Sequence, residues 1–91
     1  MCALMPNRYG RYHGLLLSLA RRATSDGAWK SRLREILSRF DEDCGSLEPV
    51  MASHLRRELA AQLETEILRF SDAEAQAVLA FAIKHFDAVG R

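Results

Sequence analysis

The chain has 91 residues, which is enough for one hydrophobic core but not for two. Hydrophobic residues make up 48% of it, and Ala, Leu, Arg and Glu predominate over glycine, proline and β-branched residues; this excludes a disordered chain and argues against β-sheet. The formal net charge of +1 neither requires nor excludes an anionic partner. We predict a single all-α domain over residues 1–91, a compact four-helix bundle with short connections.

The first predicted helix spans about residues 8–23. Apolar side chains recur along it at intervals of three and four, as one helical face requires: Tyr9, Tyr12, Leu16, Leu19, Ala20 and Ala23. Gly10 and Gly14 each weaken its first turns by ~1 kcal/mol relative to alanine. We therefore expect this helix to be frayed, or to start only near His13.

The second helix is predicted over residues 28–41, with Ser25 or Asp26 as its N-cap. Its core face consists of the apolar residues Trp29, Leu33, Ile36, Leu37 and Phe40. The acidic run 41–43 opposes the helix dipole, so the helix should end there. Gly45 then predicts a left-handed stop.

The third helix is expected to begin between Ser46 and Pro49, because proline is tolerated in the first helical turn. It should end near Phe70. Its apolar stripe runs over more than five turns: Met51, Leu55, Leu59, Leu63, Ile67 and Phe70.

The fourth helix, about residues 72–89, is preceded by the pattern of a capping box, with Ser71 as N-cap and Glu74 at the third helical position. Gly90 lies past its end. One face carries the apolar residues Ala75, Val78, Leu79, Ala82, Ile83, Phe86 and Val89. The opposite side is also apolar, with Ala73, Ala77, Ala80, Phe81 and Ala88. A helix that is apolar most of the way round is buried on two sides.

The second apolar side of this helix predicts a homodimer, because a monomer rarely leaves such a patch uncovered and two-fold association is the commonest solution. We take Ala77, Phe81 and Ala88 as the candidate dimer or partner face. In the alternative, this helix is central and the first helix covers Phe81.

Charge is unevenly distributed. Residues 1–39 carry eight basic and two acidic residues, whereas residues 40–91 carry five basic and ten acidic ones. The two halves neutralise one another within the fold or across a dimer, or else the basic half binds nucleic acid or an acidic protein. The candidate anion-binding face for the second interpretation is Arg11, Arg22, Lys30 and Arg34.

Three short motifs resemble functional segments of known families. His54 resembles the phosphoacceptor histidine of phosphorelay domains, although no acidic residue follows it. The pair Arg8 and His13 resembles the catalytic Arg/His pair of one superfamily of helical RNases, and Ser46 is similar to the serine of carrier proteins that takes a phosphopantetheine arm. Each resemblance covers about seven residues or fewer. The ordinary alternatives are a histidine on a polar stripe for His54, a basic, aromatic N-terminal arm for Arg8 and His13, and a helix N-cap for Ser46.

No pattern predicts a cofactor or a metal site, because Cys2 and Cys44 have neither CxxC spacing nor paired histidines nearby. The apolar run 15–20 is too short to span a membrane, and Arg21 follows it in place of a cleavage site, so we expect a cytoplasmic location. The sequence therefore predicts a non-enzymatic helical interaction protein. Its expected partners are a second copy and an unidentified protein; nucleic acid is the alternative.

Overall fold

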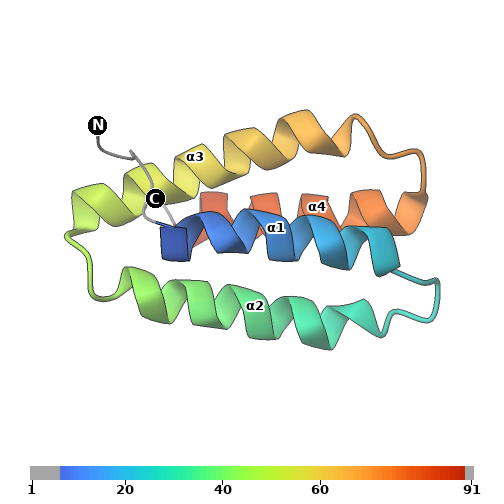
Figure 1. The fold of residues 1–91 in the computed structure, drawn as a ribbon, viewed down its shortest axis with the longest axis horizontal. Coiled ribbons are helices and arrows are strands. Elements are labelled where there is room, and N and C mark those ends of the chain that lie inside the picture. The colour runs from blue at the N-terminus through green and yellow to red at the C-terminus, as the bar shows by residue number, and fades with distance from the viewer. Residues whose placement is uncertain (1–6, 90–91) are drawn as a thin grey trace.

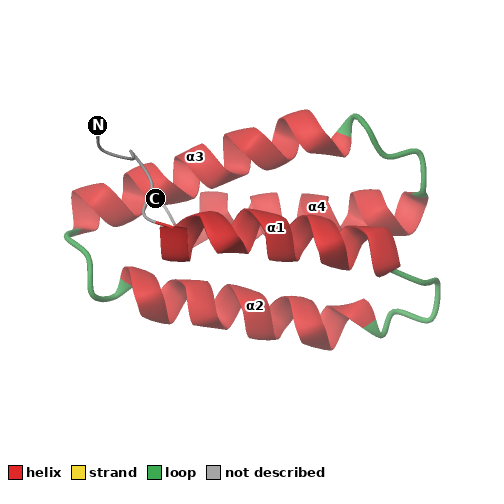
Figure 2. Ribbon diagram, viewed as in Figure 1, coloured by secondary structure: helices red, strands yellow, loops and turns green. Residues whose placement is uncertain are grey.

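The structure is a computed structural model that describes the backbone of residues 7–89 and the side chains of residues 10–88. Within this range the chain forms four helices and no strand (Figures 1 and 2): α1 (Asn7–Arg22), α2 (Trp29–Cys44), α3 (Pro49–Ile67) and α4 (Ala73–Val89). Short connections, residues 23–28, 45–48 and 68–72, join them. The prediction of an all-α four-helix bundle is confirmed.

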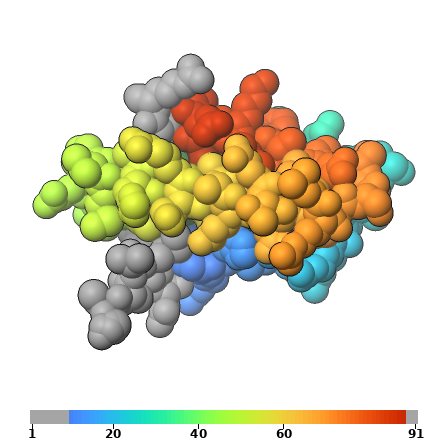
Figure 3. Space-filling view, turned by 90° about the horizontal axis from the view of Figure 1, so that it is seen from above, coloured from blue at the N-terminus to red at the C-terminus, as the bar shows by residue number. Residues whose placement is uncertain are grey.

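The helices alternate in direction along the chain, so α2 and α4 run the same way (Figure 1). α1 and α4 lie in the middle of the bundle, and α2 and α3 lie on opposite sides of this pair. α4 packs most extensively on α3, then on α1, and less on α2. Seen from above, α3 covers the seam between α1 and α4 (Figure 3). One side of α4 is thus buried against three helices.

The core receives side chains from all four helices. Aromatic edge-to-face contacts connect three of them, because the ring of Phe40 lies 5.1 Å from the rings of both Tyr12 and Phe86. The predicted core face of α2 is confirmed, since all five of its residues are buried. The largest fully buried side chains are Phe40, Phe86, Leu16, Leu33, Leu55, Leu59, Leu63, Leu79 and Val78.

α1 begins before His13, so the expectation that it starts only near that residue is wrong. The helix begins at Asn7 and continues through Gly10 and Gly14. Its core side buries Tyr12, Leu16, Leu17 and Ala20. Because burying one large apolar side chain contributes ~2 kcal/mol, this packing outweighs the low helix propensity of the two glycines. Tyr9, expected on the same face, lies outside the described side chains.

α2 does not end at the acidic run 41–43 but continues to Cys44, which is buried. Gly45 has right-handed angles, φ −62° and ψ −20°, so the predicted left-handed stop is also wrong. Among the described residues, the glycine with a positive φ is instead Gly27, in the α1–α2 connection, where φ is 75°. The acidic residues are tolerated because groups on other helices bind their carboxylates, as described below.

Asp26 organises the turn before α2 without capping the helix, and Ser25 does not cap it either. α2 begins at Trp29, after Ala28, which has no side-chain cap. The Asp26 carboxylate accepts hydrogen bonds from the Thr24 hydroxyl at 2.6 Å and from the Ala28 N–H at 3.0 Å. The first of these bonds, then the second, lowers the pKa of Asp26.

The start of α4 differs from the predicted capping box. Asp72 takes the N-cap position: its carboxylate accepts the Glu74 N–H at 3.3 Å, and its carbonyl accepts the Gln76 N–H. The Glu74 side chain does not return to Ser71, because it accepts a hydrogen bond from Trp29. The predicted capping box is therefore wrong, although the predicted fourth helix is present.

α3 begins with Pro49 in its first turn, as predicted, and ends at Ile67, three residues before the predicted end. Its stripe buries Leu55, Leu59 and Leu63, whereas Met51 is 46% exposed. On α4 the predicted core face is buried except for Ile83, which is half-buried, and Val89, which lies outside the described side chains.

Candidate interaction surface on α4

The side of α4 that faces away from the core is exposed and largely apolar. Helical spacing places the three predicted interface residues in one stripe with Ala73, Ala80 and Lys84. We call this stripe the outer face of α4: Ala73, Ala77, Ala80, Phe81, Lys84 and Ala88. Phe81 is 51% exposed, and Ala77 is half-buried. α4 is central in the bundle, as the alternative expected, but α1 does not cover the second face of α4, so that part of the alternative is wrong.

On the α2 side of this face, Phe81 borders a hollow of about 170 Å³ that Trp29, Lys30, Leu33 and Arg34 also line. The Phe81 and Trp29 rings meet edge to face, with centroids 6.4 Å apart. The Lys30 ammonium lies 5.8 Å from the centroid of the Trp29 ring. An exposed aromatic ring thus lies beside two basic side chains.

Trp29 forms a fixed wall of this hollow. It is buried, and its indole N–H donates a hydrogen bond to a carboxylate oxygen of Glu74 at 2.9 Å. The bond connects the first residue of α2 to the first turn of α4. Because a buried indole N–H needs an acceptor, this bond fixes the rotamer against which Phe81 packs.

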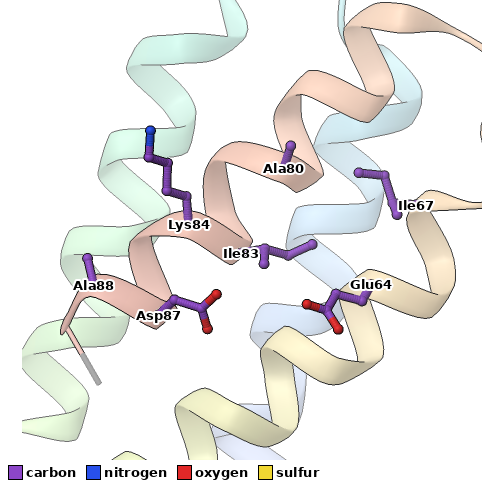
Figure 4. Close-up of a pocket in the computed structure, with 7 residues that line it drawn as sticks. All are labelled: Glu64, Ile67, Ala80, Ile83, Lys84, Asp87 and Ala88. Carbon is purple, nitrogen blue, oxygen red and sulfur yellow. The ribbon is translucent and has the colours of Figure 1, made fainter. Parts of the chain in front are cut away.

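On the α3 side of the outer face there is a second, larger hollow of about 620 Å³. Its apolar lining consists of Ile67, Ala80, Ile83 and Ala88. Figure 4 shows the carboxylates of Glu64 and Asp87 directed into the space between α3 and α4. Lys84 lines the same hollow, with its ammonium directed away from these carboxylates. Sequence reasoning missed Glu64 and Asp87, because their position beside the apolar stripe depends on how α3 packs on α4.

The two sides of the outer face carry opposite charge. We call Lys30 and Arg34 the basic margin, on the α2 side, and Glu64 with Asp87 the acidic margin, on the α3 side. Within the described part of the chain, none of these four groups forms an ion pair. Their charges are thus available to a partner.

The structure separates the four residues of the predicted anion-binding face. Lys30 and Arg34 lie beside Phe81, whereas Arg22 lies in a different groove, between α1 and α2, and Arg11 is exposed on α1. The residues that line this α1–α2 groove and its continuation are Tyr12, Leu15, Ser18, Leu19, Arg22, Arg32, Glu35, Ile36 and Arg39. Arg32 and Arg39 were not among the candidates, although their seven-residue spacing on α2 places them on one face.

A polar cluster near the other end of α2 connects all four helices. A carboxylate oxygen of Asp41 lies 2.9 Å from His85 Nε2, and the other lies 3.6 Å from the Arg56 guanidinium. The Tyr12 hydroxyl donates to Asp43 at 2.5 Å. Burial, then this hydrogen bond, raises the pKa of Tyr12 to about 12. These contacts explain why α2 accepts acidic residues in its last turn.

The remaining sequence candidates take ordinary structural positions. Burial raises the pKa of the Cys44 thiol, which disfavours a reactive thiolate. His54 is exposed on α3, and the Ser46 hydroxyl donates to the Asp43 carbonyl at 2.8 Å. His13 Nε2 lies 4.0 Å from a carboxylate oxygen of Glu66. Cys2 lies outside the described residues, and so does the side chain of Arg8.

In residues 7–89, no three His, Cys, Asp or Glu side chains are grouped so that they could hold a metal ion. None of the four helices described combines the length and the hydropathy needed to cross a membrane. Comparisons with family models, curated proteins and solved structures find no significant match to the chain.

Proposed function

We propose that the protein is a non-enzymatic interaction protein that binds through the outer face of α4, and that its first partner is a second copy of itself. The observation that carries this proposal is Phe81, a large apolar side chain that is 51% exposed and borders the hollow on the α2 side of the outer face. Exposed aromatic residues beside apolar hollows are typical of the centre of protein interfaces.

The composition of the outer face supports close contact between helices. Alanines at positions 73, 77, 80 and 88 let a second helix approach closely, because they have no bulk beyond Cβ. Phe81 then supplies the large apolar contact. A second copy is the simplest occupant, since a two-fold dimer uses the same patch on both chains.

Light scattering after size-exclusion chromatography tests this proposal on three proteins at high micromolar concentration. We expect the wild type to be dimeric and Phe81→Glu to be monomeric with an unchanged helical circular dichroism spectrum, because a half-exposed site accepts a charge in the monomer but not in an interface. Leu68→Glu is the matched control: Leu68 is 84% exposed, at the end of α3, and its variant should remain dimeric. A dimeric Phe81→Glu would exclude this face as the interface.

A second candidate function is polyanion binding by the α1–α2 groove. The observation that favours it is the gathering of Arg22, Arg32 and Arg39 around apolar side chains of one groove. Phosphate contacts are strong at about 50 mM salt and weaken steeply with added salt. A gel shift with DNA or RNA that Arg22→Glu with Arg32→Glu abolishes would support this function. If the wild type shows no shift at about 50 mM salt, the candidate fails.

A further inference from the structure

The two margins of the outer face lie at similar heights along α4. Trp29 contacts Glu74 and Asp41 contacts His85, so α2 and α4 are in register, and Arg34, five residues after Trp29, is level with about residue 79 of α4. Arg56 of α3 contacts the same Asp41, and Glu64, eight residues further along the antiparallel α3, is level with about residue 77 of α4. The two positions differ by two residues, a rise of about 3 Å, so a basic group on the α2 side is level with an acidic group on the α3 side.

Glu74 also lies on the α2 side, but its carboxylate accepts the indole N–H of Trp29. The two cations of the basic margin outnumber it, so the α2 side keeps a positive character. On the α3 side, Lys84 lines the same hollow as the two carboxylates of the acidic margin, which outnumber it.

Only two simple two-fold arrangements bring the outer faces of two copies together, because the symmetry axis must lie in the plane of the interface. If the axis is parallel to α4, the two α4 helices are parallel and the α2 side of one copy faces the α3 side of the other. If the axis is perpendicular to α4, the helices are antiparallel and each side faces its own equivalent. The parallel arrangement brings opposite charges together, and the antiparallel one brings like charges together, Arg34 against Arg34.

Shape favours the same arrangement. Phe81 projects on the α2 side, whereas the larger apolar hollow, with Ile67, Ala80 and Ile83, lies on the α3 side. In the parallel arrangement Phe81 of each copy therefore meets the hollow of the other copy. In the antiparallel arrangement it meets the basic margin instead.

Building on the proposed self-association, we infer that two copies dock with their α4 helices parallel. Phe81 of each copy enters the hollow between α3 and α4 of the other. The basic margin, Lys30 and Arg34, pairs with the acidic margin, Glu64 and Asp87. Two equivalent charge contacts result, one on each side of the axis.

Distances between spin labels test the orientation directly. Ser71 and Glu48 are both exposed and lie outside the outer face, in the connections at the two opposite ends of the bundle (Figure 1). In a Cys2→Ser background, a nitroxide is attached to Ser71→Cys in one protein and to Glu48→Cys in another; the background protein itself should remain unlabelled, because Cys44 is buried. Parallel helices give a short label-to-label distance for both proteins. Long distances for both, with a short distance only when the two proteins are mixed, would show an antiparallel dimer and overturn the inference.

Charge reversal tests the pairing. Arg34→Glu or Glu64→Lys alone should weaken the parallel dimer about tenfold, because two attractive pairs become repulsive. The two reversals in one chain should restore the affinity, and so should an equimolar mixture of the single variants. In an antiparallel dimer the two basic margins face each other, so Arg34→Glu reduces their repulsion and does not weaken the dimer. An affinity that is unchanged or higher in Arg34→Glu would therefore contradict the inference.

The two proposals fail in different ways. A wild type that stays monomeric at high micromolar concentration removes the proposed self-association and with it this inference. A wild-type dimer that Phe81→Glu dissociates, but whose labelled variants show long distances at both ends of the bundle, keeps the self-association and removes only the parallel arrangement.

Discussion

The ring of Trp29 meets the ring of Phe81 edge to face at 6.4 Å between centroids, although Trp29 is buried and Phe81 is half exposed. The Phe81 ring therefore contacts the core through Trp29, while about half of its surface is exposed to solvent. Phe81 should therefore contribute little to the stability of the monomer and more to the proposed binding.

Truncation of Phe81 should destabilise the monomer much less than truncation of Phe86, which is 1% exposed on the same helix. We expect Phe86→Ala to lower the free energy of unfolding by about 4 kcal/mol and Phe81→Ala by about 1 kcal/mol, because only Phe86 leaves a cavity in the core. Urea unfolding at low micromolar concentration, followed by circular dichroism, measures both. Equal losses would mean that Phe81 belongs to the core.

Asp72, and not Ser71, should stabilise the start of α4. Asp72→Ala removes the carboxylate that accepts the Glu74 N–H, so we expect a loss of about 1 kcal/mol in the free energy of unfolding. Ser71→Ala is the matched control and should change it by less than about 0.5 kcal/mol. A larger loss for Ser71→Ala than for Asp72→Ala in thermal or urea unfolding would instead support the capping box predicted from the sequence.

The Asp41 cluster should be required for stability. Asp41→Ala leaves the Arg56 side chain, which is 14% exposed, without its carboxylate partner. We expect a loss of about 2 kcal/mol in the free energy of unfolding, because a partly buried cation without a partner is costly. Glu42→Ala changes the neighbouring exposed carboxylate and should have little effect. Similar losses for the two variants would show that the cluster contributes nothing beyond a surface charge.

The Tyr12 hydroxyl predicts a loss of stability at alkaline pH. Its pKa is raised from 10.0 to about 12 in the folded protein, so the folded state holds this proton more tightly than the unfolded chain does. The contribution is complete below pH 10 and is lost as the pH rises from 10.0 toward about 12. Tyr12→Phe should abolish this part of the pH dependence.

Two measurements check the Tyr12 prediction. The first is the difference in urea midpoint between the wild type and Tyr12→Phe through this pH range. The second is the tyrosinate absorbance of a Tyr9→Phe protein, in which Tyr12 is the one remaining tyrosine. Ionisation of Tyr12 at its ordinary pKa would contradict the prediction.

Periodicity predicted the helices well because each core face is defined by local spacing. All five predicted core residues of α2 are buried, and Leu55, Leu59 and Leu63 of α3 are buried too. The helix ends were harder to predict, because they depend on partners far away in the sequence. His85 and Arg56 bind Asp41, and Trp29 engages Glu74, so neither acidic residue acts as its local sequence suggests.

The candidate surface, too, has one part that the sequence predicts and one part that it does not. The apolar outer face of α4 and the exposure of Phe81 follow from helical spacing. α4 has more apolar residues than its core-facing side can hold, so some of them must lie on the opposite side. The margins do not follow from it: Glu64 reaches the outer face only because α3 packs on α4, and Arg34 reaches it only because α2 lies on the other side. Relative charge placement of this kind requires the tertiary arrangement.

Sedimentation equilibrium of the wild-type protein, from low to high micromolar concentration, tests the proposed interaction surface most directly. Self-association through the outer face of α4 predicts an apparent mass that rises with concentration from the 10.3 kDa of one chain toward twice that value. An apparent mass that stays at 10.3 kDa over the whole range would contradict it.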